Sequence, residues 1–190
     1  MRAFLQRAGR RSRRAMIVPP IAGAALLALT AAVALLIAPA SASANNDPHR
    51  IYLAAAPFDF PASFCGFSVH VEFPVNKEYA KVSTGPDGST IYTVTGSLFV
   101  SLTNTVTGTT TTVNVSGPGT VTFSADGTTA TYDITGLSLL YGSNVTQFGF
   151  PSNIVLTSGP LQATIDATTS TITSMARQPH ALLDVCAALS

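Results

Sequence analysis

The stretch Phe64–Phe73, FCGFSVHVEF, decides how the rest of this 190-residue chain is interpreted. From Phe67 to Phe73, apolar and polar side chains alternate without interruption. Because successive side chains of a β-strand point to opposite faces, this alternation predicts a half-buried strand. The same stretch contains Cys65, one of the two cysteines of the chain, just before that strand.

Similar alternating segments recur along the chain, separated by turns rich in Gly, Asn and Asp. Asp126-Gly127 is typical of a tight hairpin, because glycine accepts a positive φ angle. Evenly spaced short segments of this kind predict an antiparallel all-β domain. The segments lie at residues 91–94, 98–102, 113–115, 121–123, 130–134, 161–165 and around 172.

The consecutive order of these strands leaves two architectures open. An up-and-down β-barrel is favoured, and a two-sheet β-sandwich is the alternative. Gly96 and Gly136 each interrupt what otherwise reads as one long strand, which suits the bends of a closed sheet. Residues 179–189 show apolar side chains near a spacing of 3.6, which predicts a short C-terminal helix that carries Cys186.

The N-terminus has the pattern of an export signal. Six of the ten basic residues lie within residues 2–14, and an uncharged run from 21 to 38 is followed by Ala40, Ala42 and Ala44. This order predicts a signal peptide over residues 1–44, cleaved between Ala44 and Asn45. An uncleaved membrane anchor over residues 17–38 is the alternative, and the export route, general or twin-arginine, stays open. Residues 45–62 are then an irregular lead-in, and 63–190 a single β-domain.

Removal of residues 1–44 makes the protein acidic. Four basic residues remain against nine acidic ones, a net charge of −5. Proteins that bind nucleic acid or anionic lipid need a basic patch for the phosphate groups, and this part of the chain lacks the residues to build one. We therefore expect an extracellular protein that has no nucleic-acid partner and touches a membrane only if the signal stays uncleaved.

The two cysteines are expected to form a disulfide, because an exported chain enters an oxidising compartment. Neither belongs to a C-x-x-C motif, and the three histidines are scattered, so a zinc site or a thiol nucleophile lacks partners. A bridge between Cys65 and Cys186 closes a loop of about 120 residues, which restricts the unfolded chain by ~4 to 5 kcal/mol. That is comparable with the whole stability of a small domain.

Catalytic motifs are absent from the sequence: it contains no G-x-S-x-G, Walker loop, G-x-G-x-x-G or H-E-x-x-H. The best catalytic candidates are His70 and Glu72, which share one face of the predicted strand about 7 Å apart and could act as base and orienting acid. The competing interpretation is that both side chains lie on the solvated face of an edge strand and have no catalytic role. His180 and Asp184 form a second pair, too few for a metal site. We expect no metal and no cofactor.

The chain resembles the small secreted β-rich proteins of unknown function that are abundant in high-GC Gram-positive bacteria. The resemblance lies in FCGF at residues 64–67, TNTVTG at 103–108, VNVSGPG at 113–119 and DVCAAL at 184–189. It implies export, a β-fold and a Cys-to-Cys bridge, and it implies no activity or catalytic residues.

These observations predict a secreted, disulfide-stapled, non-enzymatic β-domain. It binds a small apolar ligand or a component of the cell envelope. The alternatives are a small extracellular hydrolase or isomerase that uses His70 and Glu72, and a structural cell-surface protein. An apolar cavity inside the sheets would favour the small ligand.

Overall fold

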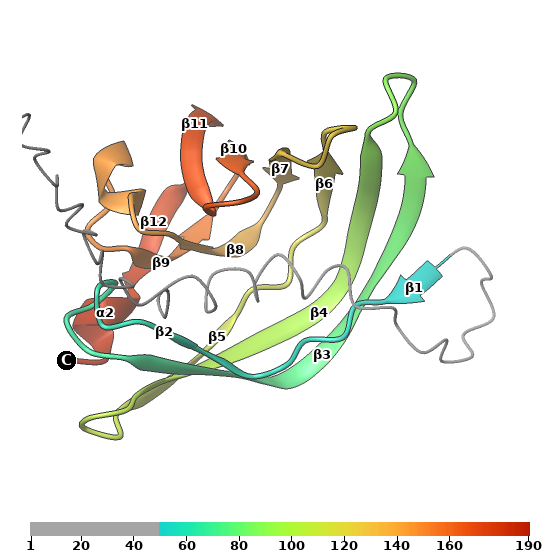
Figure 1. The fold of residues 1–190 in the computed structure, drawn as a ribbon. Coiled ribbons are helices and arrows are strands. Elements are labelled where there is room, and N and C mark those ends of the chain that lie inside the picture. The colour runs from blue at the N-terminus through green and yellow to red at the C-terminus, as the bar shows by residue number, and fades with distance from the viewer. Residues whose placement is uncertain (1–49) are drawn as a thin grey trace, which may run out of the picture.

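Residues 50–190 are described by a computed structural model, and they form two antiparallel β-sheets with one short helix near the C-terminus (Figure 1). The predicted all-β class, antiparallel pairing and C-terminal helix are therefore confirmed. No helix within residues 50–190 is both long and apolar enough to cross a membrane. The expected signal peptide, its cleavage site at Ala44 and Asn45, and the alternative anchor lie outside the described residues.

The two longest strands of the larger sheet form a long hairpin with which four of its other strands pair. Strand β3 (Val69–Thr84) pairs with β4 (Thr90–Asn104) from Val69 opposite Asn104 to Thr84 opposite Thr90. The outer edge of β3 pairs with β1 (Arg50–Tyr52) and β2 (Phe58–Phe60), and the outer edge of β4 pairs with β5 (Thr110–Asn114) and β6 (Gly119–Phe123).

The larger sheet continues beyond β6 and has nine strands. Its order is β1-β3-β4-β6-β7-β10-β11, with β2 and β5 paired at the far ends of β3 and β4. A second sheet of three strands has the order β12-β9-β8. The remaining bounds are β7 (Thr129–Ile134), β8 (Leu137–Tyr141), η1 (Val145–Phe148), β9 (Ile154–Ser158), β10 (Leu161–Asp166), β11 (Thr171–Arg177), β12 (His180–Asp184) and α2 (Val185–Ala188).

A bulge in β3 changes which side chains face the interior. Glu72 pairs with Ser101 and Val75 pairs with Phe99, so β3 uses three residues where β4 uses two. The extra residue falls at Phe73-Pro74, and proline suits such a site because it cannot donate a ladder hydrogen bond. Before the bulge the odd-numbered Val69 and Val71 are buried, and beyond it the even-numbered Ala80 is buried.

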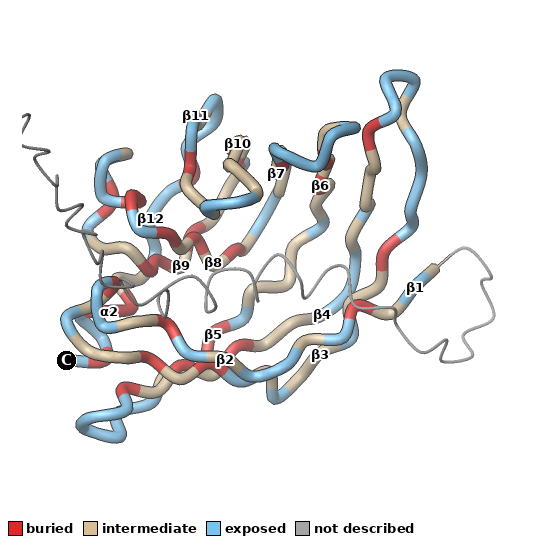
Figure 2. The backbone as a smooth tube through the Cα atoms, viewed as in Figure 1, coloured by how far each residue is buried: buried red, intermediate tan, exposed pale blue. Residues whose placement is uncertain are grey.

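The main core lies between the two sheets. Val71 and Leu102 of the long hairpin and Ile154 of β9 belong to one buried cluster, which also includes Val185 and Leu189 at the C-terminus. Figure 2 shows these buried segments on facing parts of the two sheets. The described strands form no closed barrel, so the two-sheet alternative describes the arrangement. Gly136 (φ 100) lies where the chain passes from β7 of one sheet to β8 of the other.

The C-terminal segment differs from the predicted helix over 179–189. Residues 180–184 form strand β12, because they find pairing partners on β9, from His180 opposite Ser158 to Asp184 opposite Val155. Only Val185–Ala188 is helical, and the Asp184 carboxylate accepts a hydrogen bond from the Ala187 backbone N–H. The prediction of an irregular lead-in over residues 45–62 is also wrong at two places. Arg50–Tyr52 and Phe58–Phe60 are strands that pair with β3.

Two contacts fix the C-terminus against the long hairpin. Cys65 and Cys186 form the expected disulfide, with their Cα atoms 5.1 Å apart across a sequence separation of 121. The buried Asn104, at the end of β4, donates from Nδ2 to the Leu189 carbonyl and accepts from the Val106 N–H. The first contact is covalent and the second satisfies a buried amide, so both hold the last residues in the core.

We predict that replacing both cysteines by serine, Cys65→Ser with Cys186→Ser, lowers the free energy of unfolding by about 4 kcal/mol, because the unfolded chain regains its loop entropy. Chemical denaturation of the oxidised protein and the double variant measures the difference. Reductant should shift the midpoint of the natural protein and leave the variant unchanged. Equal midpoints for the two proteins would contradict the prediction.

Candidate ligand cavity between the two sheets

An apolar cavity of about 260 Å³ lies between the larger sheet and β8 of the smaller one. Its walls come from the β1–β2 connection, from β2 to β4, from β6 to β8 and from the β5–β6 connection. Most of the lining side chains are apolar, among them Phe73, Leu98, Val121 and Leu139. The sheets therefore border a partly open space that their own side chains do not fill.

One wall of the cavity is the connection between β1 and β2, which is tied to β3 at Leu53. The Leu53 N–H donates to the Glu78 carbonyl at 3.0 Å, and Asn76 Nδ2 donates to the Leu53 carbonyl at 2.7 Å. Leu53, Ala54 and Ala55 all line the cavity. The hydrogen bonds thus hold this segment over the interior face of β3.

Among the described residues that line the cavity, Glu78 has the one charged side chain. No residue within 50–190 donates a hydrogen bond to its carboxyl group or forms an ion pair with it. Burial raises the pKa of the Glu78 carboxyl above its ordinary value of 4.5, because desolvation disfavours the charged form. The cavity therefore combines apolar walls with a single unpartnered acid.

The bulge at Phe73-Pro74 is the reason that Glu78 faces inward. Without it, regular alternation from Val71 would turn position 78 to the outer face. Directly opposite Glu78 stands Gly96, with φ +142, where an added Cβ would overlap the Lys77 carbonyl oxygen. Sequence analysis did not single out Glu78, although Pro74 within the strand pattern was the signal that could have revealed the bulge.

The other polar groups of the cavity wall are neutral. Tyr132 and Tyr141 both line it, and burial raises the pKa of each phenol above 10, so both stay protonated at neutral pH. The Ser138 and Thr157 hydroxyls hydrogen-bond each other at 2.8 Å. These groups can donate or accept hydrogen bonds, but they carry no charge to offset Glu78.

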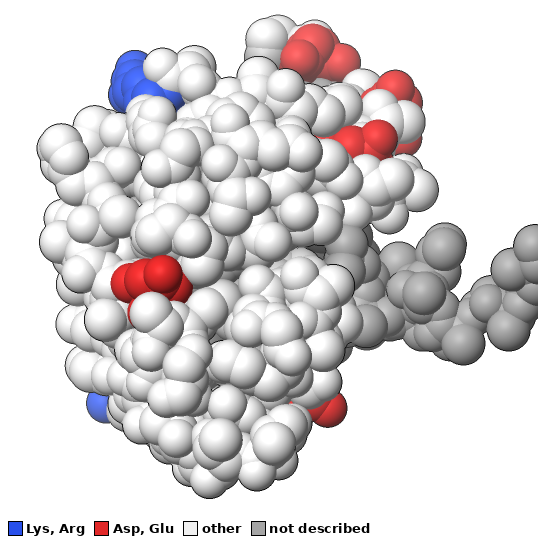
Figure 3. Space-filling model, turned by 90° about the vertical axis from the view of Figure 1, so that its left-hand side faces the viewer, with Lys and Arg blue, Asp and Glu red and all other residues white. Residues whose placement is uncertain are grey.

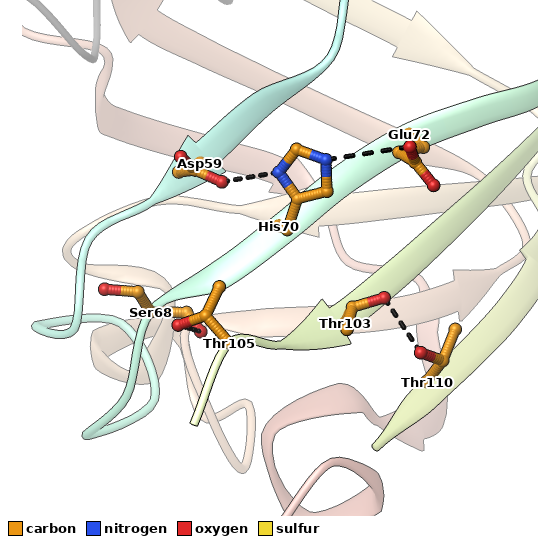
Figure 4. A network of polar contacts seen from close by, with 7 residues as sticks. All are labelled: Asp59, Ser68, His70, Glu72, Thr103, Thr105 and Thr110. Carbon is orange, nitrogen blue, oxygen red and sulfur yellow. Dashed lines mark hydrogen bonds and ion pairs between the residues drawn. The ribbon is translucent and has the colours of Figure 1, made fainter. Parts of the chain in front are cut away.

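The predicted catalytic pair lies elsewhere, on the outer face of β3 (Figure 4). His70 Nδ1 is 2.7 Å from Asp59 Oδ1, across the β2–β3 pairing, and His70 Nε2 is 3.7 Å from Glu72 Oε1. The His70 and Glu72 side chains are 39% and 58% exposed. β3 is an inner strand here, flanked by β2 and β4, rather than an edge strand.

This surface network favours a protonated imidazole. The hydrogen bond to Asp59 raises the pKa of His70 above 6.5, and the charges of Asp59 and Glu72 add to the effect. A general base needs one ring nitrogen free to take a proton from its substrate. Because each ring nitrogen of His70 already faces a carboxylate, the arrangement resembles a surface ion-pair cluster more than an acid–base site.

The second candidate pair is also separated from the cavity. His180 and Asp184 lie at the two ends of β12, and Asp184 caps helix α2. Within residues 50–190, no three His, Cys, Asp or Glu side chains are grouped as a metal would require. The outer surface carries little charge in general: Figure 3 shows one face on which acidic and basic side chains form only small, separate patches.

Comparisons of the chain with family models, with curated proteins and with solved structures find no match. The geometry of the described residues is therefore the basis for the function proposed below.

We predict that Asp59→Asn lowers the pKa of His70 toward 6.5, because it removes the strongest partner of the imidazolium. NMR titration of the histidine ring protons measures this pKa. Glu72→Gln is the matched control and should lower the pKa less, since its contact is longer. The stabilisation from this network should be present below pH 6.5 and disappear as the pH rises through the raised pKa. An unchanged pKa in Asp59→Asn would contradict the assignment.

A second prediction concerns Glu78. Burial raises the pKa of Glu78 in the folded protein, so its contribution to stability is greatest below pH 4.5 and falls as the pH rises from 4.5 to the raised pKa, because the unfolded chain ionises first; above the raised pKa it stays constant. Glu78→Gln should therefore raise the free energy of unfolding at pH 7, by on the order of 1 kcal/mol, and flatten this decrease. Denaturant unfolding between pH 4 and 8 tests it, with Glu72→Gln as the exposed control. Parallel pH profiles for Glu78→Gln and the natural protein would rule out a buried Glu78.

Proposed function

We propose that this protein is an exported β-domain that binds a small apolar ligand in the cavity between its two sheets. The observation that carries the proposal is the cavity itself. Ligand sites are typically concave, mostly apolar and provided with a few polar groups that orient the ligand. The space bounded by Leu98, Val121 and Leu139, with Glu78 in its wall, fits this description.

The size of the cavity limits the ligand. Its volume of about 260 Å³ is just below the range of ordinary ligand pockets, which begins near 300 Å³. Engineered apolar cavities of about 150 Å³ bind benzene. A molecule of one or two rings, or a short alkyl chain, therefore suits this site better than a long-chain lipid.

Binding a ligand also offers a physical advantage to the fold. Side chains that line an empty apolar space lose van der Waals contacts on one side, and a ligand restores them. A purely structural protein would gain stability by filling this space with larger side chains. The unfilled cavity thus favours a ligand-binding role over a structural role at the cell surface.

A small ligand also fits the surface better than a large partner does. Within residues 50–190, the large apolar side chains that lie exposed are Ile51, Val82, Val106 and Leu182; Ile51 and Val82 lie on the paired strands β1 and β3, and the other two come from separate segments. Macromolecular binding sites usually gather such side chains into one patch. We therefore propose that the bound molecule, whether it comes from the envelope or from the medium, lies inside the cavity.

Secretion remains part of the proposal. The N-terminal pattern of residues 1–44 supports it, and so does the Cys65–Cys186 disulfide, since such bonds persist in oxidising compartments. The resemblance to small secreted β-rich proteins of high-GC Gram-positive bacteria agrees with this location.

The test is binding of an uncharged fluorophore with two rings, 6-propionyl-2-dimethylaminonaphthalene. We expect the natural protein to bind it with enhanced fluorescence, and Val94→Phe, which puts a ring into the cavity, to weaken binding at least tenfold. Val82→Phe makes the same change at a 45% exposed position outside the cavity wall and should bind normally.

Two results would overturn the proposal. One is a folded natural protein that binds neither this fluorophore nor small alkyl or aromatic compounds. The other is equal loss of binding in Val94→Phe and Val82→Phe, which would place the fluorophore outside the cavity. Circular dichroism of each variant confirms that the sheets are intact.

A further inference from the structure

We infer that the cavity selects apolar ligands that carry one protonated amine, and that the Glu78 carboxylate is the group that recognises the amine. This inference rests on the proposed ligand-binding function and adds the chemical class of the ligand. It comes from the placement of one unpartnered carboxyl group among described lining residues that are otherwise uncharged.

The charge distribution around Glu78 is one-sided. The lining residues from β4, β6 and β8 and from the β1–β2 and β5–β6 connections are apolar, glycine or serine, and β7 adds Tyr132. Tyr141, from β8, is the only other titratable group among the described lining residues, and both tyrosines are neutral at pH 7. No lysine, arginine or histidine of residues 50–190 lines the cavity. The positive charge that Glu78 lacks must then come from solvent or from a ligand.

The basic residues Arg50 of β1 and Lys77 of β3 are directed away from the cavity. Arg50 donates to the Thr95 hydroxyl at 2.6 Å and lies 5.3 Å above the Tyr79 ring. Lys77 and Tyr79 precede and follow Glu78 in β3, so their side chains leave from the opposite face of the sheet. The cation–π contact of Arg50 is therefore separated from the cavity by the sheet itself.

A carboxylate in this position discriminates between ligands by charge. An alkylammonium group would pair with Glu78 at low local dielectric, where the attraction is stronger than in water. The faces of Tyr132 and Tyr141 could add cation–π contacts. A ligand carboxylate would instead place two negative charges side by side, so fatty acids are selected against.

A matched series of eight-carbon ligands tests the inference: octylamine, octanol and octanoate share one chain and differ in the charge of the head group. Isothermal titration at pH 7 measures each dissociation constant. We expect octylamine to bind on the order of tenfold more tightly than octanol, and octanoate to bind most weakly. Glu78→Gln should abolish the preference and leave octanol binding within about twofold. Glu72→Gln, the same change on the outer face, should keep the preference.

The pH dependence gives a second readout. Octylamine affinity should fall as the pH is lowered through the pKa of Glu78, because the carboxyl becomes neutral, while octanol affinity stays constant. Glu78→Gln should remove this dependence. Tyr132 and Tyr141, the other titratable groups of the wall, stay neutral throughout the acidic range.

The outcomes separate this inference from the proposed function. If octanol and octylamine bind the natural protein equally, or if Glu78→Gln keeps the amine preference, the role of Glu78 is wrong while the ligand cavity stands. If none of the three compounds binds the folded protein, both the inference and the proposed function fail. Thermal unfolding of Glu78→Gln verifies that any loss of preference occurs in a folded protein.

Discussion

The bulge in β3 at Phe73-Pro74 is the constraint on which the rest of the structure depends. It divides the long β3–β4 hairpin into two parts with opposite inward faces. The first part buries Val69 and Val71 against the smaller sheet, and the second turns Glu78 and Ala80 inward. A bulge also bends and twists its strand, which suits the curvature of the larger sheet in Figure 1. One extra residue thus shapes both the fold and the cavity.

The end of the molecule that carries α2 is secured by different means. There the Cys65–Cys186 bond and the Asn104 amide hold the last residues against the beginning of β3 and the end of β4. The cluster of Phe60, Phe64 and Leu189 fills this end, so it contains core rather than open space. The cavity adjoins this core: Leu98 and Val115 pack against the core and also line the cavity, whose wall includes Gly117 and Gly119.

Much of the fold could be predicted from local patterns. The alternation in Phe67–Phe73 and the Asp126-Gly127 turn depend on neighbouring residues, which the sequence displays directly, and the disulfide was expected from the number and position of the two cysteines. Strand β12 could not be predicted in this way, because residues 180–184 have a helical spacing that pairing with β9 overrides. Whether the sheet closes is likewise a long-range property, so the favoured barrel was wrong and the two-sheet alternative describes the strands within residues 50–190.

The candidate site shows the same division. His70 and Glu72 share a face because side chains two residues apart on a strand point the same way. The contact of Asp59 with His70 Nδ1 could not be predicted, since it depends on the register between β2 and β3. Glu78 was missed because alternation continued through Pro74 assigns it to solvent. A single bulge reverses that assignment. Glu78 then lies in the wall of an apolar cavity, where the sequence pattern showed no charged side chain.

Titration of the Glu78 carboxyl group tests most directly whether this side chain lies in the cavity wall. Glu72 and Glu78 are the only two glutamates in the chain, so selective ¹³C labelling of glutamate gives two carboxyl signals, and Glu78→Gln identifies which belongs to Glu78. The account predicts that the pKa of Glu78 lies above 4.5 and that octylamine lowers it by stabilising the carboxylate. A Glu78 pKa at or below 4.5, unaffected by the amine, would show that this side chain faces water and would contradict the central claim.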